Sequence, residues 1–218
     1  RQNDKKGRMH MLELIKITKK FGDFYALKDV NLKVGDGEVH TLLGENGAGK
    51  STTIKAILNL IKKDAGQIEI LGRKEQEIDF DTRNRIGVVF DKHNFPASMS
   101  PNNLGKLLET VYPLWDRNLY WELLKKLSLP LNRKIKKLSK GMKMKLAIAV
   151  ALSHHSEILI LDEPTAGLDP GERVRFRNLL SEFAQERIVL ISTHIVSDVE
   201  YIAAENAVMK AGKIIAQD

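Results

Sequence analysis

The stretch that decides the fold is residues 38–51, EVHTLLGENGAGKS, in which a short apolar run leads into a glycine-rich loop. Residues 38–43 form a β-like run, and Lys50–Ile61 continues with a helical pattern. Between them, Gly44–Ser51 matches the phosphate-loop pattern G-x-x-x-x-G-K-S/T. Its four fixed positions would arise by chance in roughly one chain of this length in a hundred. The order of strand, loop and helix predicts nucleotide binding and makes hydrolysis the expected reaction.

The residue types of this loop suit a phosphate group. Glycines let backbone N–H groups turn inward around phosphate oxygens, and the start of the following helix favours an anion. Lys50 is expected to reach the β- and γ-phosphates, and the Ser51 hydroxyl is expected to bind Mg²⁺. The alternative is a glycine-rich turn with a structural role only. The residues expected to contact the nucleotide here are Gly44, Glu45, Asn46, Gly47, Ala48, Gly49, Lys50, Ser51 and Thr52.

A second polar cluster is predicted where two apolar runs end. Ile158–Leu161 is followed by Asp162 and Glu163, and Ile188–Ser192 is followed, after one threonine, by His194. Short apolar runs of this kind are typical of parallel strands covered on both faces, and ligands bind beyond the C-terminal ends of such strands. We therefore expect Asp162 to hold Mg²⁺, Glu163 to act as general base or water positioner, and His194 to contact the γ-phosphate. The alternatives are a solvated acidic strand end and a structural histidine.

The remaining chain alternates β-like runs with helical patterns, which favours an α/β fold with a largely parallel sheet. Asn102–Leu152 contains no convincing strand, and we expect it to form a helical sub-domain inserted between two strands of the core. Other expected elements are an edge strand around Leu12, Leu14 and Ile17, β-like runs at Gln67–Leu71 and Arg85–Phe90, and a helix with Phe176, Leu179, Leu180 and Phe183 on one face.

Composition excludes several classes of protein. The chain has 218 residues and no cysteine, which rules out disulfide scaffolds and thiolate metal sites and fits a reducing compartment. Its longest apolar run, Leu146–Leu152, is far shorter than the ~20 residues of a membrane span, so we do not expect the chain itself to form a pore. Arg1–His10 is charged and aperiodic. We interpret it as a disordered extension or a cloning remnant, with Met11 as a natural start and no secretory signal.

Leu138–Met142, LSKGM, lies just ahead of the helical pattern that leads to Asp162. Together with the motifs above, it closely resembles the signature sequence of ABC ATPases, the nucleotide-binding subunits of ABC transporters. The resemblance runs from about Leu12 to Gly212. It implies a phosphate-loop NTPase core with a mostly parallel sheet, an N-terminal antiparallel β part and a helical sub-domain at about residues 96–153. It also implies a single ABC ATPase domain at residues 11–218, with ATP and Mg²⁺ as cofactors.

The resemblance extends to further site residues. Ala166–Asp169 is similar to the family's D-loop, which places Asp169 at the nucleotide, and His194 matches its switch histidine. Phe21 is similar to the aromatic residue that stacks on adenine, with Tyr25 as the less favoured choice.

The family mechanism implies that one chain cannot complete the site. Two chains are expected to pair head to tail, as a homodimer or with a homologous subunit, with two ATP molecules between them. Each ATP then contacts the phosphate loop of one chain and Ser139 and Gly141 of the other. A hydroxyl and backbone near a helix N-terminus make a reasonable second anion site.

This chain departs from the family pattern at three positions. Lys140 stands where the signature usually has glycine, and Met142 stands where it has glutamine, a version that looks like subunits of ABC-2 type exporters for antibiotics and peptides. Asp91 follows the β-like run Arg85–Phe90 where the family has a glutamine that touches Mg²⁺ or the attacking water. A carboxylate can bind Mg²⁺ directly or through a water. The alternative is that Asp91 points to solvent or caps the following turn.

Two functions of different classes fit these patterns. The leading interpretation is an ATP-hydrolysing subunit of a membrane exporter, peripheral on the cytoplasmic face of the cell membrane and partnered by a separate transmembrane permease subunit. The alternative is a soluble ABC-type ATPase that handles nucleic acid or serves as an assembly scaffold. No long coiled coil, zinc module or second ATPase domain is evident in the sequence, which favours the exporter.

Two groups of side chains leave their role open. The formal net charge is +7, and basic residues near the signature suggest a solvated face, attraction to phosphate and anionic lipids, or a nucleic-acid surface. Without interleaved aromatic residues or a recognised binding fold, we expect no nucleic-acid partner. These basic residues are Arg133, Lys134, Lys136, Lys137, Lys140, Lys143 and Lys145. The residues between His93 and Trp115 that either pack in the sub-domain or line a groove for a membrane subunit are Phe95, Met99, Tyr112 and Trp115.

Overall fold

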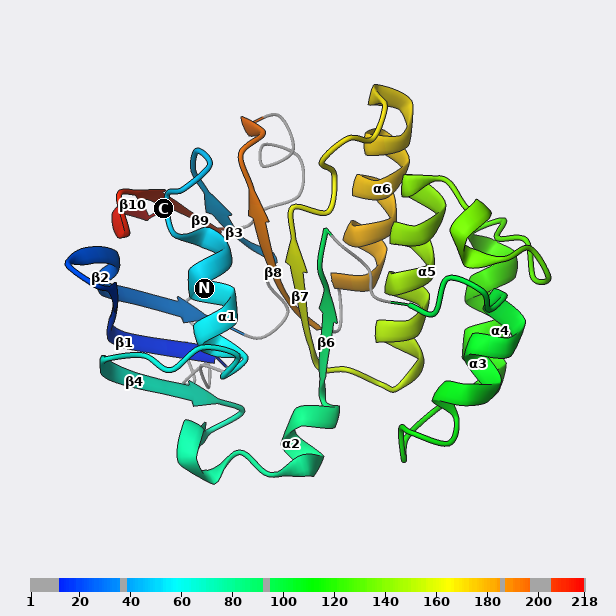
Figure 1. Cartoon of the computed structure of the whole chain (residues 1–218), viewed down its shortest axis with the longest axis horizontal. Helices are drawn as coiled ribbons and strands as arrows, with labels where there is room; N and C mark the ends of the chain where they lie inside the picture. Colours follow the sequence, from blue (N-terminus) through cyan, green and yellow to red (C-terminus); the bar gives the residue numbers. More distant parts are fainter. Residues whose placement is uncertain (1–11, 36–38, 92–94, 185–186, 197–204, 218) are drawn as a thin grey trace, which may run out of the picture.

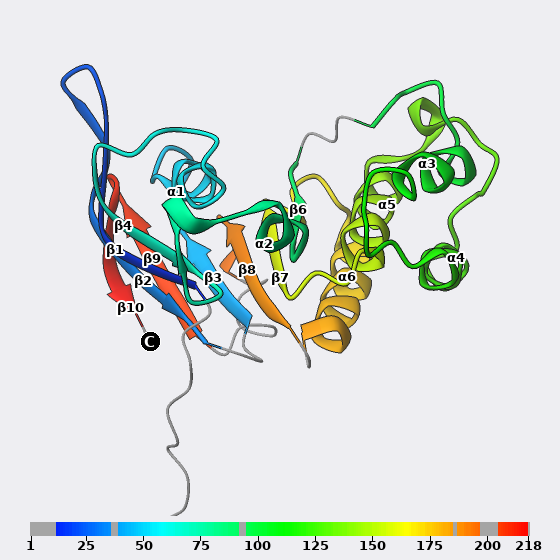
Figure 2. The same ribbon diagram turned by 90° about the horizontal axis from the view of Figure 1, so that it is seen from below.

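The computed structural model describes residues 12–35, 39–91, 95–184, 187–196 and 205–217. Two sheets and the helices between and beside them make up these ranges (Figure 1). Seen from below, the four-stranded sheet and the last hairpin of the chain lie at one side and the longest helices lie toward the other, with the remaining strands of the six-stranded sheet between them (Figure 2). The predicted charged segment Arg1–His10 lies outside the described residues, as do Glu38 and His93.

The N-terminal sheet is antiparallel, as predicted. Its strand order is β2-β1-β4-β5. The strands are β1 (Leu12–Phe21), β2 (Phe24–Val34), β4 (Ala65–Ile70) and β5 (Arg73–Lys74). The prediction of an edge strand at Leu12, Leu14 and Ile17 was wrong, because β1 pairs with β2 on one side and β4 on the other. All three side chains are buried on the face that packs against the rest of the molecule.

The six-stranded sheet has the order β10-β9-β3-β8-β7-β6 and is parallel except for the β9–β10 hairpin. Its strands are β3 (Val39–Leu43), β6 (Ile86–Val89), β7 (Ile158–Asp162), β8 (Ile188–Thr193), β9 (Glu205–Lys210) and β10 (Lys213–Gln217). Every residue of β7 and β8 is buried. Successive side chains of these strands enter two separate hydrophobic clusters, so apolar packing covers both faces.

Helix α1 (Lys50–Ile57) begins directly at the glycine-rich loop and packs between the two sheets (Figure 1). The predicted helix over Lys50–Ile61 was too long at its C-terminal end. Asn59 adopts a left-handed conformation with φ of 53°. The Leu60 and Asn59 N–H groups donate to the carbonyls of Lys55 and Ala56, a helix-ending arrangement that closes the last turn.

The chain between β6 and β7 is helical and contains no strand within its described residues, as predicted for Asn102–Leu152. Its helices are α3 (Pro101–Leu108), α4 (Arg117–Lys126), the short 3₁₀ turn η2 (Ile135–Lys137) and α5 (Lys140–Ser153). Upstream lie the turn η1 (Glu75–Glu77) and helix α2 (Phe80–Asn84), and α6 (Pro170–Phe183) follows β7.

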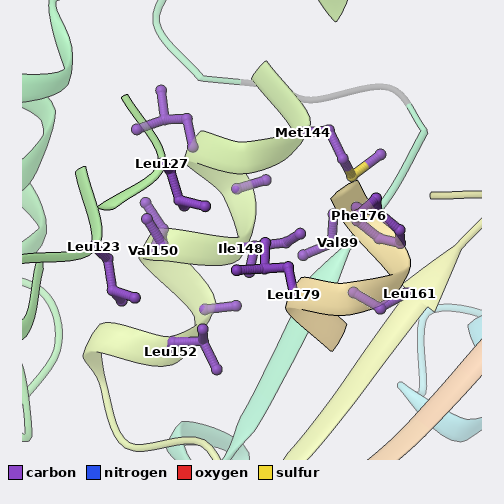
Figure 3. Close-up of a cluster of buried hydrophobic side chains, with 14 of the residues drawn as sticks. Val89, Leu123, Leu127, Met144, Ile148, Val150, Leu152, Leu161, Phe176 and Leu179 are labelled. Atoms are coloured by element: carbon purple, nitrogen blue, oxygen red, sulfur yellow. The ribbon is translucent and has the colours of Figure 1, made fainter. Parts of the chain in front are cut away.

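Helix α5 is the centre of the larger hydrophobic cluster. Figure 3 shows its side chains between α4 on one side and α6 with the ends of β6 and β7 on the other. The predicted face of α6 is confirmed, since Phe176, Leu179 and Leu180 are buried and Phe183 packs against the same cluster. This packing fixes where the first turn of α5 lies relative to the strand ends.

Within the described residues, no helix combines the length and apolar character that crossing a bilayer requires.

Candidate functional site

The glycine-rich loop has a conformation that only its glycines allow. Gly47 and Gly49 have φ of 84° and 111°, which L side chains rarely adopt. A Cβ at Gly44 would lie 2.5 Å from the Met209 carbonyl, and one at Gly49 would lie 3.0 Å from the Ala26 carbonyl. The loop is therefore wedged against β2 and β9, and its backbone leads directly into α1.

Lys50 is the first residue of α1 and is buried, with 5% of its surface exposed. Its ammonium donates to the carbonyls of Gly44 at 2.6 Å and Glu45 at 3.1 Å. It also lies 3.2 Å from Glu163 Oε1. A phosphate group entering the loop would compete with this carboxylate for the Lys50 charge, so the three-way contact ties phosphate binding to the position of Glu163.

Asp162, which is predicted to hold Mg²⁺, ends β7 and faces the start of α1. Its Oδ1 accepts from the Ser51 hydroxyl at 3.0 Å and from the Ser192 hydroxyl at 2.6 Å. Ser192 belongs to β8, which runs parallel beside β7. Sequence reasoning missed Ser192 as a partner, although its place as the last residue of the run Ile188–Ser192 was available as a signal.

These residues fit a Mg²⁺ ion. Ser51 and Asp162 offer the hard oxygen donors that Mg²⁺ prefers, and Asp91 Oδ1 is shielded from solvent with no aligned hydrogen-bond donor among the described residues. No group of three or more His, Cys, Asp or Glu side chains within those residues could enclose an ion without help. This suits Mg²⁺, which usually keeps several bound waters and is held by one or two carboxylates together with substrate phosphates.

Glu163 and His194 lie together at the ends of β7 and β8. His194 Nδ1 is 2.7 Å from Glu163 Oε2. Glu163 has φ of 50°, and its N–H donates to both the Ser192 carbonyl and hydroxyl. A non-glycine residue in the left-handed region stores backbone strain, which at strand ends accompanies functional sites. The turned backbone directs the carboxylate between Lys50 and His194.

A pocket of about 570 Å³ opens in front of these groups. Its lining includes the predicted residues Asn46, Ser51, Asp91, Asp162, Glu163 and His194, together with Lys55, Phe90 and Ala166. A second space of about 450 Å³ lies on the other side of the loop, against β9 and β10. The structure thus gathers the loop, both acids and the histidine around one opening.

Three predicted contact residues lie outside this pocket. Ser139 is exposed, and its hydroxyl caps α5 by accepting from the Met142 N–H at 3.1 Å. Gly141 lies in the first turn of α5, where a Cβ would fall 1.9 Å from Glu172 Oε2. Asp169 caps α6 by accepting from the Glu172 N–H at 2.8 Å. None of the three lines the pocket around the phosphate loop.

Phe21 lies at the end of β1, next to the turn of the β1–β2 hairpin, and its ring is 55% exposed. It lines neither of the two pockets that flank the phosphate loop. Tyr25, the less favoured choice, has Lys20 at 4.3 Å and Lys28 at 5.1 Å from its ring centroid. The contact with Lys20 lowers the pKa of Tyr25. Among the described residues, Phe21 has one ammonium near its ring, Lys19 Nζ at 5.3 Å from the centroid, and is more exposed than Tyr25, which favours Phe21 for stacking.

Asp91 has a partner that sequence reasoning missed. Its Oδ1 lies 2.6 Å from the Lys140 ammonium, and its side chain is 40% exposed. The signal was available, because Asp91 and Lys140 both depart from the family pattern and carry opposite charges.

The structure also gives the positions of the two groups of side chains whose role the sequence leaves open. Phe95, Met99 and Trp115 pack against the larger cluster, and Tyr112 stacks on His154 with ring centroids 4.4 Å apart, which favours core packing for all four. Among the basic residues, Lys140 and Lys145 form ion pairs, with Asp91 and Glu172. The exposed remainder that fits a solvated face is Arg133, Lys134, Lys136 and Lys137.

A phosphate loop at the start of a helix, facing acids at the ends of parallel strands, is the arrangement of phosphate-loop ATPases, and the fold and pocket place the chain in that class. Within the class, the chain belongs to the ABC transporter family, because the sequence model of that family matches residues 27–166. It is an ATP-binding cassette with the ATP-hydrolysing core of that family.

Curated relatives match most of the chain. The bacitracin transport ATP-binding protein of Bacillus licheniformis is 36% identical over 203 residues, which is 91% of this chain and 66% of that protein. The lantibiotic transport ATP-binding protein of Streptococcus pyogenes is 34% identical over 208 residues, covering 94% of this chain and 89% of that protein. The Nod factor export ATP-binding protein of Rhizobium leguminosarum is 33% identical, and the match covers 68% of that protein.

Solved structures agree with this assignment. A dimeric ATP-binding cassette in a post-hydrolysis state, bound to ADP and Pi, has a TM-score of 0.82 and 28% identity, with 95% of this chain and 98% of that chain covered. The ATP-binding subunit of an ABC transporter gives a TM-score of 0.85 at 28% identity, with coverage of 95% and 89%.

Proposed function

We propose that this chain is the subunit that binds and hydrolyses ATP to power a membrane exporter. The observation that carries the proposal is the contact of Lys50 and His194 with the two oxygens of Glu163, at the mouth of the phosphate loop. Relatives that match at least 91% of this chain are named for the transport of bacitracin and of a lantibiotic, which supports an exporter. We propose that all these features belong to one ABC ATPase domain over residues 11–218, with residues 96–153 as its helical sub-domain.

The chemistry follows from the groups around the pocket. Glu163 takes a proton from the attacking water or orients that water, and its contact with His194 holds the carboxylate in place. Lys50 neutralises phosphate charge, and Gly44–Thr52 supplies backbone donors and the start of α1. Ser51, Asp162 and Asp91 would hold Mg²⁺, which offsets charge on the phosphate oxygens when it is bound. His194, 42% exposed, can also donate to the γ-phosphate.

The second half of each site is proposed to come from another chain. Ser139 caps the start of α5 and is exposed, whereas Gly141 is buried in the first turn, and neither lines the pocket of its own chain. Because a helix N-terminus favours an anion, this turn is suited to the γ-phosphate held by a partner. Phe21 would stack on adenine and Asp169 would approach the nucleotide between the two chains. A homodimer satisfies this arrangement, as does a pair with a homologous subunit.

The membrane part is proposed to lie on a separate permease polypeptide. The relatives are named as ATP-binding proteins of transport or export. We infer a location at the cytoplasmic face of the cell membrane, held there by the permease. The exposed lysines lack interleaved aromatic residues, so we assign no nucleic-acid partner.

Co-purification tests this function. An affinity-tagged full chain, expressed with the neighbouring reading frames of its genome and extracted in mild detergent, should retain an integral membrane protein with about six apolar spans of ~20 residues each. ATP hydrolysis should rise when the pair is placed in lipid vesicles, and Lys50→Ala in the same complex should abolish it. Retention of nucleic acid or of a soluble partner instead of a membrane protein would favour the alternative of a soluble ABC-type ATPase.

A further inference from the structure

Lys140 sits at an unusual place for a lysine. It is the first residue of α5, where the positive end of the helix dipole repels a cation. Its side chain turns away from the helix to Asp91, with 2.6 Å between Nζ and Oδ1. Nζ also lies 3.3 Å from the position of a Cβ on Gly167, in the segment between Asp162 and α6. The ammonium group therefore bridges the start of α5 and the rim of the pocket.

Asp91 stands on the other side of this bridge. It follows β6 and lines the same pocket as Ser51 and Asp162. Its Oδ1 is shielded from solvent and, within the residues that the structure describes, has no hydrogen-bond donor at good geometry. The Lys140 ammonium lies close enough to neutralise this oxygen, so the carboxylate is held at the pocket rim by the charge of Lys140.

We propose that Lys140 is a positioning residue for Asp91, which holds this carboxylate at the pocket rim and links its engagement with Mg²⁺ to the first turn of α5. This rests on the proposed function, in which Asp91 contributes to a Mg²⁺ site. The Asp91 carboxylate then has two cationic partners, Mg²⁺ and Lys140. A stronger contact with the metal weakens its contact with Lys140. The first turn of α5, which carries Ser139 and Gly141, thereby responds to whether Asp91 engages Mg²⁺ in the pocket of the same chain.

A second set of contacts anchors α5 independently of Lys140. Lys145 lies 3.5 Å from Glu172 Oε1, and Glu172 also packs against Gly141. This pair ties α5 to α6 and includes no residue that lines the pocket. These contacts remain when the Lys140 contact is lost, so α5 stays anchored to α6 and the expected effect is local to the start of the helix.

The test compares ATP affinity with and without Mg²⁺. Calorimetric titration with ATP, in excess Mg²⁺ and again in excess EDTA, gives the ratio of the two dissociation constants at concentrations where sedimentation shows monomers. In Lys140→Met, Asp91 is unpaired, so it repels Mg²⁺-free ATP more and reaches the metal more readily. The ratio of the Mg²⁺-free to the Mg²⁺-bound dissociation constant should rise by about two- to fivefold, the factor expected for an exposed ion pair.

Matched variants separate this role from the loss of one positive charge. Lys143→Met removes the same charge in the same turn, at a lysine with no ion pair to another described residue, and should leave the ratio unchanged. Lys140→Arg keeps the charge and should restore the wild-type ratio. Introducing Lys140→Met into Asp91→Asn should no longer change the ratio. A second readout needs no nucleotide: amide hydrogen exchange at Met142 and Lys143 should be faster in Lys140→Met than in Lys143→Met.

The outcomes are distinguishable. An unchanged ratio in Lys140→Met, or an equal rise in Lys143→Met, overturns the positioning role while leaving ATP binding intact. Wild-type protein that fails to bind ATP at all would instead contradict the proposed function. If Lys140→Met unfolds, Lys140→Gln provides the same measurement with a polar side chain at this half-exposed position.

Discussion

The pocket at the strand ends and the first turn of α5 both bind anions in the proposed mechanism, yet they are built differently. In the pocket, Lys50 and Asp162 are buried and satisfied by their own chain. At the start of α5, Ser139 is exposed and its hydroxyl only caps its own helix. The contrast indicates that one half of the site is complete within the chain, whereas the other half is presented outward. In the proposed mechanism, a second chain completes the outward half.

The two regions are joined by one contact. Asp91 lines the pocket, and Lys140 lies in the first turn of α5. Their ion pair connects the two regions through a carboxylate that lines the pocket. Substitutions in the pocket or at Lys140 should therefore change chemistry or metal dependence, whereas substitution of Ser139 should change pairing.

The largest expected effect is in the pocket. Glu163→Gln keeps the shape of the side chain but removes the carboxylate that would take or orient a proton. Steady-state ATP hydrolysis should fall by about 10²–10⁴-fold, the scale of a lost general base, while ATP binding survives. Glu182→Gln, on the surface of α6, is the control and should hydrolyse ATP normally. A rate within about twofold of wild type for Glu163→Gln would remove Glu163 from this role.

A smaller effect is expected where the two regions meet. Asp91→Asn removes the charge that repels Mg²⁺-free ATP and weakens the contact with Mg²⁺, since an amide oxygen is a poorer ligand than a carboxylate. ATP affinity in EDTA should rise while the hydrolysis rate in Mg²⁺ falls. Asp81→Asn, an exposed change of equal charge on α2, should alter neither quantity. Parallel titration curves with and without Mg²⁺ for wild type and Asp91→Asn would place Asp91 outside the metal shell.

The smallest effect is expected at the far end of α5, in the core. His154 is buried, and burial lowers its pKa despite the Asn84 carbonyl 2.8 Å from Nδ1. The unfolded chain then binds this proton more readily than the folded chain. Its contribution to stability is therefore full above the ordinary histidine pKa of about 6.5 and is lost as pH falls below it, toward the lower folded pKa.

Denaturant titrations between pH 5 and 8 measure this contribution. His154→Phe keeps the stacking on Tyr112 but removes the titrating group, so its free energy of unfolding should fall less steeply with acid than that of wild type. His155→Asn serves as control because His155 is exposed and asparagine tolerates its positive φ. Identical pH slopes for wild type and His154→Phe would mean that His154 does not titrate in this range.

Much of the pocket could be predicted from the sequence because its residues are set by short local patterns. The phosphate loop needs glycines at fixed positions, and Asp162, Glu163 and His194 directly follow apolar strands that pair side by side. Once the strands are parallel neighbours, their ends must meet. For these residues, the local sequence pattern is therefore enough to predict the position in space.

Other features depend on partners distant in sequence. The central place of β1 is set by β2 and β4 together, which no pattern within Leu12–Ile17 specifies. The end of α1 depends on the left-handed conformation of Asn59, in a segment whose apolar periodicity continues past it. The Asp91–Lys140 pair forms only because the chain between β6 and β7 folds back and brings the start of α5 next to the end of β6.

The central claim, that the outward half of the site serves another chain, is tested most directly by sedimentation. With saturating Mg²⁺–ATP, Glu163→Gln should sediment as a dimer, and without nucleotide it should be a monomer. Adding Ser139→Arg places a bulky charge at the exposed start of α5 and should leave the doubly substituted protein monomeric with ATP, whereas Ser98→Arg, at another exposed serine between β6 and β7, should still permit the dimer. An ATP-dependent dimer that persists in Glu163→Gln with Ser139→Arg would contradict the account.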